Sequence, residues 1–246
     1  MVKRYSKEKI NAIKSAIDDA LAQGAKPIAA FDADGTLWNT DMGEYFFHYQ
    51  VKNNLLPNLP KNPLDFYQKL FDQDAKAAFL WLVQINKNRS LTEIKKWTQR
   101  AFDEFKNFPV FDDVLEIIHF LQTKKVKIYI VTASMKWAVE PAAKSLGLSA
   151  DQIIGVTTKI VDELVTDEPE GIMTWQEGKA TRILSEIAPH QPFFCAGNTM
   201  GDLALLEAAT HIRLVNCALP PQHLIYESEQ RLIEVAKARN WFYHSH

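Results

Sequence analysis

Two aspartates, Asp32 and Asp34, directly follow a short apolar run in this chain of 246 residues. The run, Pro27–Phe31, contains small and apolar side chains and closes on a polar cluster with Gly35. This pattern predicts a buried parallel strand that ends in a loop, and functional side chains of α/β folds gather at that end. We expect the loop to present Asp32 directly and Asp34 from a turn. A simple strand-ending turn would use the same residue types, so both interpretations stay open at this point.

Apolar strand-like segments and amphipathic segments alternate from residue 112 onward. We predict strands at Val126–Val131, Gln152–Val156, Pro192–Ala196 and His211–Val215. We predict helices at Asp113–Thr123, Val139–Leu146, Gly178–Ala188 and Gly201–Ala208. Further expected elements are an amphipathic helix at Ser6–Gln23 capped by Ser6, a hairpin at Thr157–Thr166 and a mostly helical tail at Gln222–Trp241. The alternation implies an α/β fold, a Rossmann-like parallel sheet with helices on both faces.

Composition excludes several classes of protein. Lys and Arg total 28 and Asp and Glu total 30, so a net charge of −2 gives no strong field for nucleic acid or an anionic membrane. The first 21 residues hold no continuous apolar segment, which predicts neither a secretory signal nor a membrane span. The only cysteines, Cys195 and Cys217, lie in apolar contexts and are expected to be buried and reduced. We therefore expect a cytoplasmic protein, and we favour a monomer.

The stretch from Asp32 to Leu37, Asp-Ala-Asp-Gly-Thr-Leu, resembles the first motif of the haloacid dehalogenase-like phosphotransferases, Asp-x-Asp-Gly-Thr-Leu/Val. The resemblance implies that Asp32 attacks phosphorus to form an aspartyl-phosphate and that Asp34 is the general acid and base. The chemistry needs both residues. A carboxylate is an available nucleophile at neutral pH, and a second group must protonate the leaving alkoxide and then activate water.

Two further motifs of this family are matched in order. Thr132, Ala133 and Ser134 follow a predicted strand and resemble the second motif, in which the Thr132 hydroxyl would bind the transferring phosphoryl group. Ala133 and Ser134 are expected beside it as substrate-binding residues. Lys179 opens a predicted helix and resembles the third motif. A lysine near a helix N-terminus is unfavourable against the helix dipole, which suggests that it balances anionic groups of the site and the substrate.

The fourth motif is acidic and implies a Mg²⁺ cofactor. Gly197-Asn198-Thr199-Met200-Gly201-Asp202 resembles the family's Gly-Asp-x-x-x-Asp, with Asn198 where the family most often has Asp. The predicted metal-binding residues are Asp32, Asp34 through its carbonyl, Asn198 and Asp202. An amide oxygen can bind a hard cation but brings no charge. From the sequence alone, Asn198→Asp is therefore expected to tighten Mg²⁺ binding.

The segment between the first strand and the next strand signal resembles a family cap. We predict helices near Asp41–Asn53, Leu64–Phe71, Asp74–Asn86 and Thr92–Asn107. The predicted domains are an α/β core over 1–40 and 109–246 and an α-helical cap domain over 41–108. Such a cap excludes water and supplies substrate contacts.

Within the superfamily, the chain is most similar to phosphoserine phosphatase-like members. These place a Glu nine residues after the nucleophile to contact a substrate amine, where this chain has Asp41. Aromatic residues in and near the cap suggest phosphocholine as another substrate, because aromatic faces bind quaternary ammonium groups. These residues are Trp38, Tyr45, Phe46, Trp81, Trp97 and Trp137. The alternative is that most of them form the cap core.

The predicted function is Mg²⁺-dependent hydrolysis of a small phosphomonoester through an aspartyl-phosphate, with a phosphoserine-like or phosphocholine-like substrate favoured. A phosphomutase with the same intermediate is one alternative. A phospholigand-binding module without turnover is the other, and Asn198 is the departure that raises it.

Overall fold

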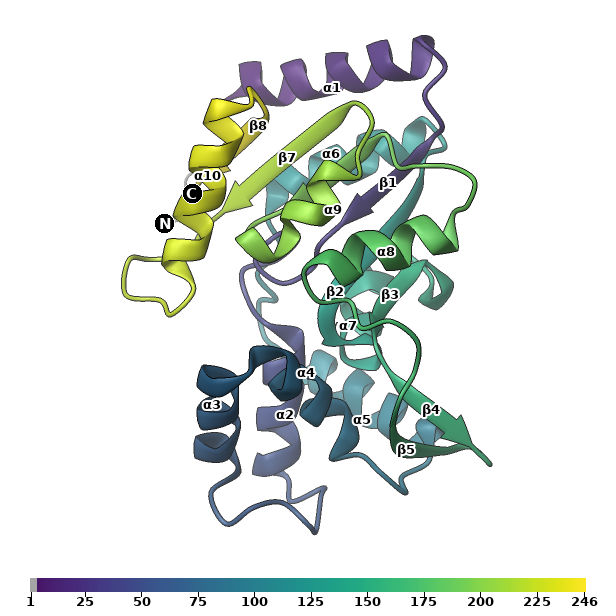
Figure 1. Ribbon diagram of the computed structural model, residues 1–246, viewed down its shortest axis with the longest axis vertical. Helices are drawn as coiled ribbons and strands as arrows, with labels where there is room; N and C mark the ends of the chain where they lie inside the picture. Colours follow the sequence, from purple (N-terminus) through teal and green to yellow (C-terminus); the bar gives the residue numbers. More distant parts are fainter. Residues whose placement is uncertain (1–3) are drawn as a thin grey trace. The chain divides into compact units, whose positions relative to one another are not determined.

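The computed structural model describes residues 4–246, which fold as two compact units (Figure 1). The first unit comprises Met1–Asn39, Pro109–Val131 and Thr174–His246, apart from the first three residues. The second comprises Thr40–Phe108 and Thr132–Met173. It therefore contains the predicted cap residues 41–108 together with residues 132–173, which the sequence assigned to the core.

A six-stranded sheet has the strand order β3-β2-β1-β6-β7-β8. The strands are β1 (Ile28–Phe31), β2 (Lys127–Met135), β3 (Ile153–Val156), β6 (Phe194–Gly197), β7 (Ile212–Cys217) and β8 (Phe242–Ser245). The pairings β1–β2, β1–β6, β6–β7 and β7–β8 are all parallel. The predicted Rossmann-like α/β fold is thereby confirmed.

Helices cover both faces of this sheet in the first unit. They are α1 (Lys7–Ala22), α6 (Asp112–Thr123), α8 (Glu177–Glu186), the 3-10 turn η2 (Met200–Asp202), α9 (Leu203–Glu207) and α10 (Tyr226–Ala238). In the view of Figure 1, α8 and α9 lie in front of the sheet and α6 lies behind it. Helix α1 packs against α6, where Lys14 pairs with Glu116. As predicted, Ser6 caps α1, and its side chain accepts a hydrogen bond from the Lys9 backbone N–H.

The register of the central strands sets the place of the site. Phe31, the last residue of β1, pairs with Ile130 on β2 and with Ala196 on β6. Because parallel strands point the same way, the residues that follow β1 and β6 emerge together at the carboxyl ends of the strands. The strands are anchored below these ends by fully buried rings, since Phe31 stacks on Phe194 with centroids 5.2 Å apart.

The second unit has its own core. It contains α2 (Met42–Lys52), α3 (Pro63–Gln73), α4 (Ala75–Gln84), α5 (Leu91–Glu104), α7 (Lys136–Ser145), the 3-10 turn η1 (Ala150–Gln152), and the antiparallel hairpin of β4 (Thr158–Val161) and β5 (Leu164–Pro169). The four helices of 41–108 and the hairpin agree with the sequence pattern. Buried side chains from α2, α4, α5 and α7 form one cluster, which includes Phe46, Val83, Trp97 and Trp137.

One strand was missed. The tail predicted as mostly helical, Gln222–Trp241, contains α10, and β8 follows it outside the predicted elements and pairs in parallel with β7. Cys195 and Cys217 are buried and free, as expected. No helix within residues 4–246 is long and apolar enough to cross a bilayer.

Candidate active site

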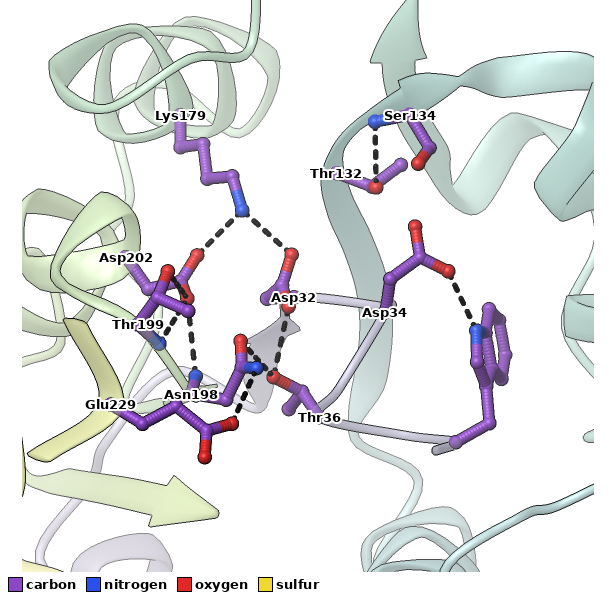
Figure 2. Close-up of polar contacts among 11 residues, drawn as sticks. Asp32, Asp34, Thr36, Thr132, Ser134, Lys179, Asn198, Thr199, Asp202 and Glu229 are labelled. Atoms are coloured by element: carbon purple, nitrogen blue, oxygen red, sulfur yellow. Dashed lines mark hydrogen bonds and ion pairs between the residues drawn. The ribbon is translucent and has the colours of Figure 1, made fainter. Parts of the chain in front are cut away.

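Asp32 lies directly beyond β1 and is almost completely buried. Its backbone N–H donates to the Ala196 carbonyl at 2.9 Å, which extends the β1–β6 pairing by one residue. The Lys179 ammonium, from the first turn of α8, lies 2.6 Å from Asp32 Oδ1 and 2.5 Å from Asp202 Oδ1 (Figure 2). The structure thus joins three predicted site residues from three separate motifs into one buried ion cluster.

Electrostatics in this cluster favour the protonated form of Lys179. They disfavour ionisation of Asp32 next to the Asp202 carboxylate. Burial and the nearby Asp202 carboxylate raise the pKa of Asp32 to about 7, although Lys179 acts to lower it. Burial alone would lower the pKa of Lys179, but Asp202 and Asp32 outweigh burial and hold it above its ordinary value. The lysine therefore carries a permanent positive charge at neutral pH, next to the predicted nucleophile.

Two oxygen atoms that could bind a cation face the hydroxyl of Thr36. This hydroxyl donates to Asp32 Oδ2 at 2.9 Å and lies 3.4 Å from Asn198 Oδ1. Carboxylate and amide oxygens are ligands that suit a hard cation such as Mg²⁺. In the described part of the chain, no three His, Cys, Asp or Glu side chains form a metal-binding group. A cation here would therefore depend on the Asn198 amide and on backbone oxygens as well as on Asp32.

Asp202 holds the loop that carries Asn198. Its Oδ2 accepts hydrogen bonds from the backbone N–H groups of Asn198 at 3.1 Å and Thr199 at 3.0 Å, while its Oδ1 contacts Lys179. Gly197 permits this arrangement, because a Cβ there would lie 2.4 Å from the Asp202 Cβ. Both oxygens of Asp202 have protein donors. This geometry favours a supporting role over direct coordination, and its role as a metal ligand stays a prediction.

Asp34 lies in a different environment from Asp32. The backbone turns at Gly35, whose φ is +79°, and the Trp38 indole N–H donates to Asp34 Oδ1 at 2.7 Å. Trp38 is completely buried, so this donor is fixed in place. The two carboxylates of the motif therefore lie in different environments: Asp32 is paired with a cation, and Asp34 with a neutral donor.

Gly35 also makes room for Asn198. A Cβ at this position would lie 2.1 Å from Asn198 Nδ2, closer than any real contact. We expect Gly35→Ala to lower the free energy of unfolding by the roughly 1–2 kcal/mol of left-handed strain plus the roughly 1–3 kcal/mol typical of overpacking. Urea unfolding measures the loss, and Gly24→Ala is the matched control, because φ is +87° there with no atom within 4 Å. Equal losses of unfolding free energy in the two variants would mean that the Asn198 side chain moves away from the added methyl group without cost.

The remaining predicted residues belong to the second unit. Within it, the side chains of Asp41 and Ser134 both approach Gly43, because a Gly43 Cβ would lie 3.0 Å from Ser134 Oγ and 3.3 Å from Asp41 Oδ1. Asp41 also caps α2 by accepting from the Glu44 N–H at 2.8 Å. The Thr132 hydroxyl accepts a hydrogen bond from the Ser134 N–H at 3.0 Å. The substrate-binding roles of Asp41, Thr132, Ala133 and Ser134 stay predictions.

Glu229 was missed by the sequence analysis. This side chain of α10 is fully buried and accepts a hydrogen bond from Asn198 Nδ2 at 3.0 Å. Burial raises its pKa. The available signal was its position, since Glu229 lies on the same buried face of α10 as Leu232, Ile233 and Ala236. An acidic residue on an apolar helix face needs a partner inside the protein.

Comparison with known families decides the class of the protein. A sequence model of the family described as haloacid dehalogenase-like hydrolase matches residues 29–207, a span that contains Asp32, Lys179 and Asp202. The chain belongs to this family. The expectation of a haloacid dehalogenase-like enzyme is thereby confirmed. No curated protein sequence matches the chain significantly.

Solved structures share the fold of this haloacid dehalogenase-like hydrolase. A protein of unknown function from Bordetella pertussis Tohama I is 18% identical, with a TM-score of 0.73 over 89% of this chain and 98% of that one. A functionally unknown protein from Anaerococcus prevotii DSM 20548 is 16% identical, with a TM-score of 0.71 over 99% and 94%. A substrate-bound phosphoserine phosphatase is 16% identical, with a TM-score of 0.54 over 85% and 97%. At these identities the likeness concerns the fold.

Proposed function

We propose that the protein is a Mg²⁺-dependent phosphatase that hydrolyses a small phosphomonoester through an aspartyl-phosphate on Asp32. The observation that carries the proposal is the pairing of Asp32 with Lys179, 2.6 Å apart in a buried cluster at the carboxyl ends of the strands. A carboxylate can approach an anionic phosphoryl group only where positive charge offsets the repulsion. A similar fold belongs to a phospho-aspartyl intermediate analogue of phosphoserine phosphatase, 16% identical with a TM-score of 0.51.

The residues divide the two half-reactions between them. Asp32 attacks phosphorus, the bond to the leaving oxygen breaks, and Asp34 delivers a proton to that oxygen. Asp34 then takes a proton from water as the water attacks the phosphoryl group, which releases phosphate and frees Asp32. Lys179 stabilises the negative charge of the phosphoryl oxygens throughout. Mg²⁺ bound to oxygens of Asp32, Asp34 and Asn198 would neutralise further charge of the phosphate.

Packing in the second unit favours a phosphoserine-like substrate over a phosphocholine-like one. Phosphocholine recognition needs aromatic faces that a quaternary ammonium group can reach. Phe46, Trp97 and Trp137 are at least nine-tenths buried in the helical core. Tyr45 packs against Phe105 with ring centroids 4.3 Å apart. Most of the aromatic residues therefore serve packing, whereas Asp41 keeps a carboxylate beside Ser134 that suits a substrate amine.

A phosphate-release screen tests the proposal. Purified protein is incubated with O-phosphoserine, phosphocholine, a sugar phosphate and an aryl phosphate, with Mg²⁺ and with EDTA. Phosphate release that requires Mg²⁺ is the expected result. Isomerisation of the sugar phosphate without phosphate release would instead identify a phosphomutase, and tight binding without turnover at any Mg²⁺ concentration a binding module. The proposed setting is a monomer in the cytoplasm.

The role of Asp34 predicts a dependence on the leaving group. Asp34→Asn should lower the turnover rate by roughly 10² to 10⁴-fold for an alkyl phosphate, whose alkoxide needs a proton. The loss should be smaller for an aryl phosphate, whose leaving group needs less protonation. Single-turnover rates with both substrates measure the difference. Equal losses would remove Asp34 from the role of acid.

A further inference from the structure

Glu229 is a buried carboxylate that lies outside all four family motifs. It comes from α10, and none of its surface is exposed. Its Oε1 accepts a hydrogen bond from Asn198 Nδ2 at 3.0 Å, and its Oε2 accepts one from the Leu219 backbone N–H, also at 3.0 Å. Each carboxylate oxygen therefore has a donor of its own. Removal of either donor would leave a buried carboxylate oxygen without a hydrogen-bond partner, which costs free energy. The structure therefore favours this one pairing of the two oxygens with their donors.

This contact decides which atom of Asn198 faces the Asp32 cluster. The oxygen and the nitrogen of a side-chain amide are nearly equal in size, so the amide group fits either way round. Its hydrogen-bond partners determine which way it is turned. Both oxygens of Glu229 act as acceptors here, one from Asn198 and one from the Leu219 N–H, and an acceptor at this position selects Nδ2. The Asn198 oxygen points the other way, toward the Thr36 hydroxyl that donates to Asp32 (Figure 2).

We propose that Glu229 is a positioning residue for the cation site: it orients the Asn198 amide so that Oδ1 lies toward Asp32 and Thr36, where it would be available to a bound cation. It also retains, behind the amide, the negative charge that an aspartate at position 198 would carry. The inference rests on the proposed Mg²⁺-dependent function. Groups behind the ligands of a metal typically orient those ligands and change metal affinity by about 10- to 100-fold.

Exchanging the amide of position 198 with the carboxylate of position 229 tests the positioning role of Glu229 separately from the total charge. With Asn198→Asp alone, two carboxylates face each other across the present 3.0 Å contact and repel. This reverses the sequence-based expectation that an aspartate at 198 tightens Mg²⁺ binding by itself. With Glu229→Gln alone, the side chain at 229 has one acceptor oxygen where the carboxylate had two. Either the Leu219 N–H loses its partner, or Asn198 turns its NH₂ group toward the cation.

The double variant Asn198→Asp/Glu229→Gln satisfies every group again. The introduced glutamine can accept from Leu219 with its oxygen and donate to the carboxylate at 198 with its nitrogen, and the net charge equals that of the wild type. We expect each single variant to bind Mg²⁺ at least about tenfold more weakly than the wild type. The double variant should bind at least as tightly as the wild type, because its charge lies closer to the cation.

The test is calorimetric titration of the substrate-free proteins with Mg²⁺ alone. Near-ultraviolet circular dichroism of each variant first establishes a native fold, and Glu234→Gln is the matched control, because Glu234 is an exposed residue of α10 that pairs with Lys237. Unchanged affinity in Glu229→Gln, or additive losses in the double variant, would overturn the inference. If the wild type neither binds Mg²⁺ nor releases phosphate, the proposed function fails. If it does both while Glu229→Gln binds normally, only the role of Glu229 fails.

Discussion

Asp32→Asn is expected to abolish phosphate release, with a loss of roughly 10⁴-fold or more, because the proposed covalent intermediate forms on the Asp32 carboxylate. The substitution is nearly isosteric. The introduced amide keeps an oxygen that can accept from Lys179, and Asp202 still pairs with this lysine at 2.5 Å. The variant should therefore stay folded, so that the loss of activity reports on chemistry.

Initial rates of phosphate release and acid-quenched labelling with a ³²P substrate measure this effect. The wild type should yield an acid-stable, base-labile phosphoprotein, and the Asp32→Asn variant none. Asp167→Asn is the matched control, because Asp167 is an exposed carboxylate whose partner is Lys87. Appreciable turnover by the Asp32 variant, or labelling that persists in it, would assign the nucleophile to another residue.

Local patterns were sufficient for most of the fold. The apolar run before Asp32 and the alternation after residue 112 have the periods that helices and strands impose, and the sheet follows from them. The missed strand, β8, is different. Phe242–Ser245 is four residues long, includes a histidine and a serine, and lies at the edge of the sheet. Its pairing with β7 is a tertiary contact that no local pattern encodes.

The same distinction explains the site. Asp32, Lys179 and Asp202 were found because their motifs retain a recognisable order along the chain, and the structure joins them. Trp38 and Glu229 were not assigned these roles, because each acts through a contact with one other side chain, Asp34 or Asn198. Such contacts depend on the register of packed elements. The only sequence signal for Glu229 was a charge on a buried helix stripe.

The ion cluster is a compromise between stability and chemistry. Three charged groups, Asp32, Lys179 and Asp202, are removed from water, and their mutual attraction offsets a desolvation cost of several kcal/mol for each ion. Replacement of a buried ion cluster by hydrophobic residues of similar volume is often neutral or stabilising in proteins. The cluster is explained better by what it does to Asp32, which it holds beside a fixed positive charge.

Lys179→Met tests this view through stability. It removes the cation but keeps an unbranched side chain, and it leaves the buried Asp32 and Asp202 carboxylates without their partner. Breaking a buried pair in this way typically costs about 3–5 kcal/mol. Urea unfolding at pH 8 in EDTA measures the loss. The control is Lys14→Met, which breaks the more exposed pair with Glu116 and should cost about 1 kcal/mol or less.

The destabilisation by Lys179→Met should also depend on pH, and the sign follows from Asp32. Its folded-state pKa is about 7 with Lys179 present, and it rises further without the lysine, which acts to lower it. Between the pKa values of the unfolded and folded states, the folded variant holds a proton that the unfolded chain, with a pKa near 3.8, has already released. Stability is therefore retained at low pH and lost as the pH rises through the folded-state pKa. The variant should be closer to the wild type in unfolding free energy at pH 5.5 than at pH 8, and an equal difference at both values would contradict the coupling of Lys179 to Asp32.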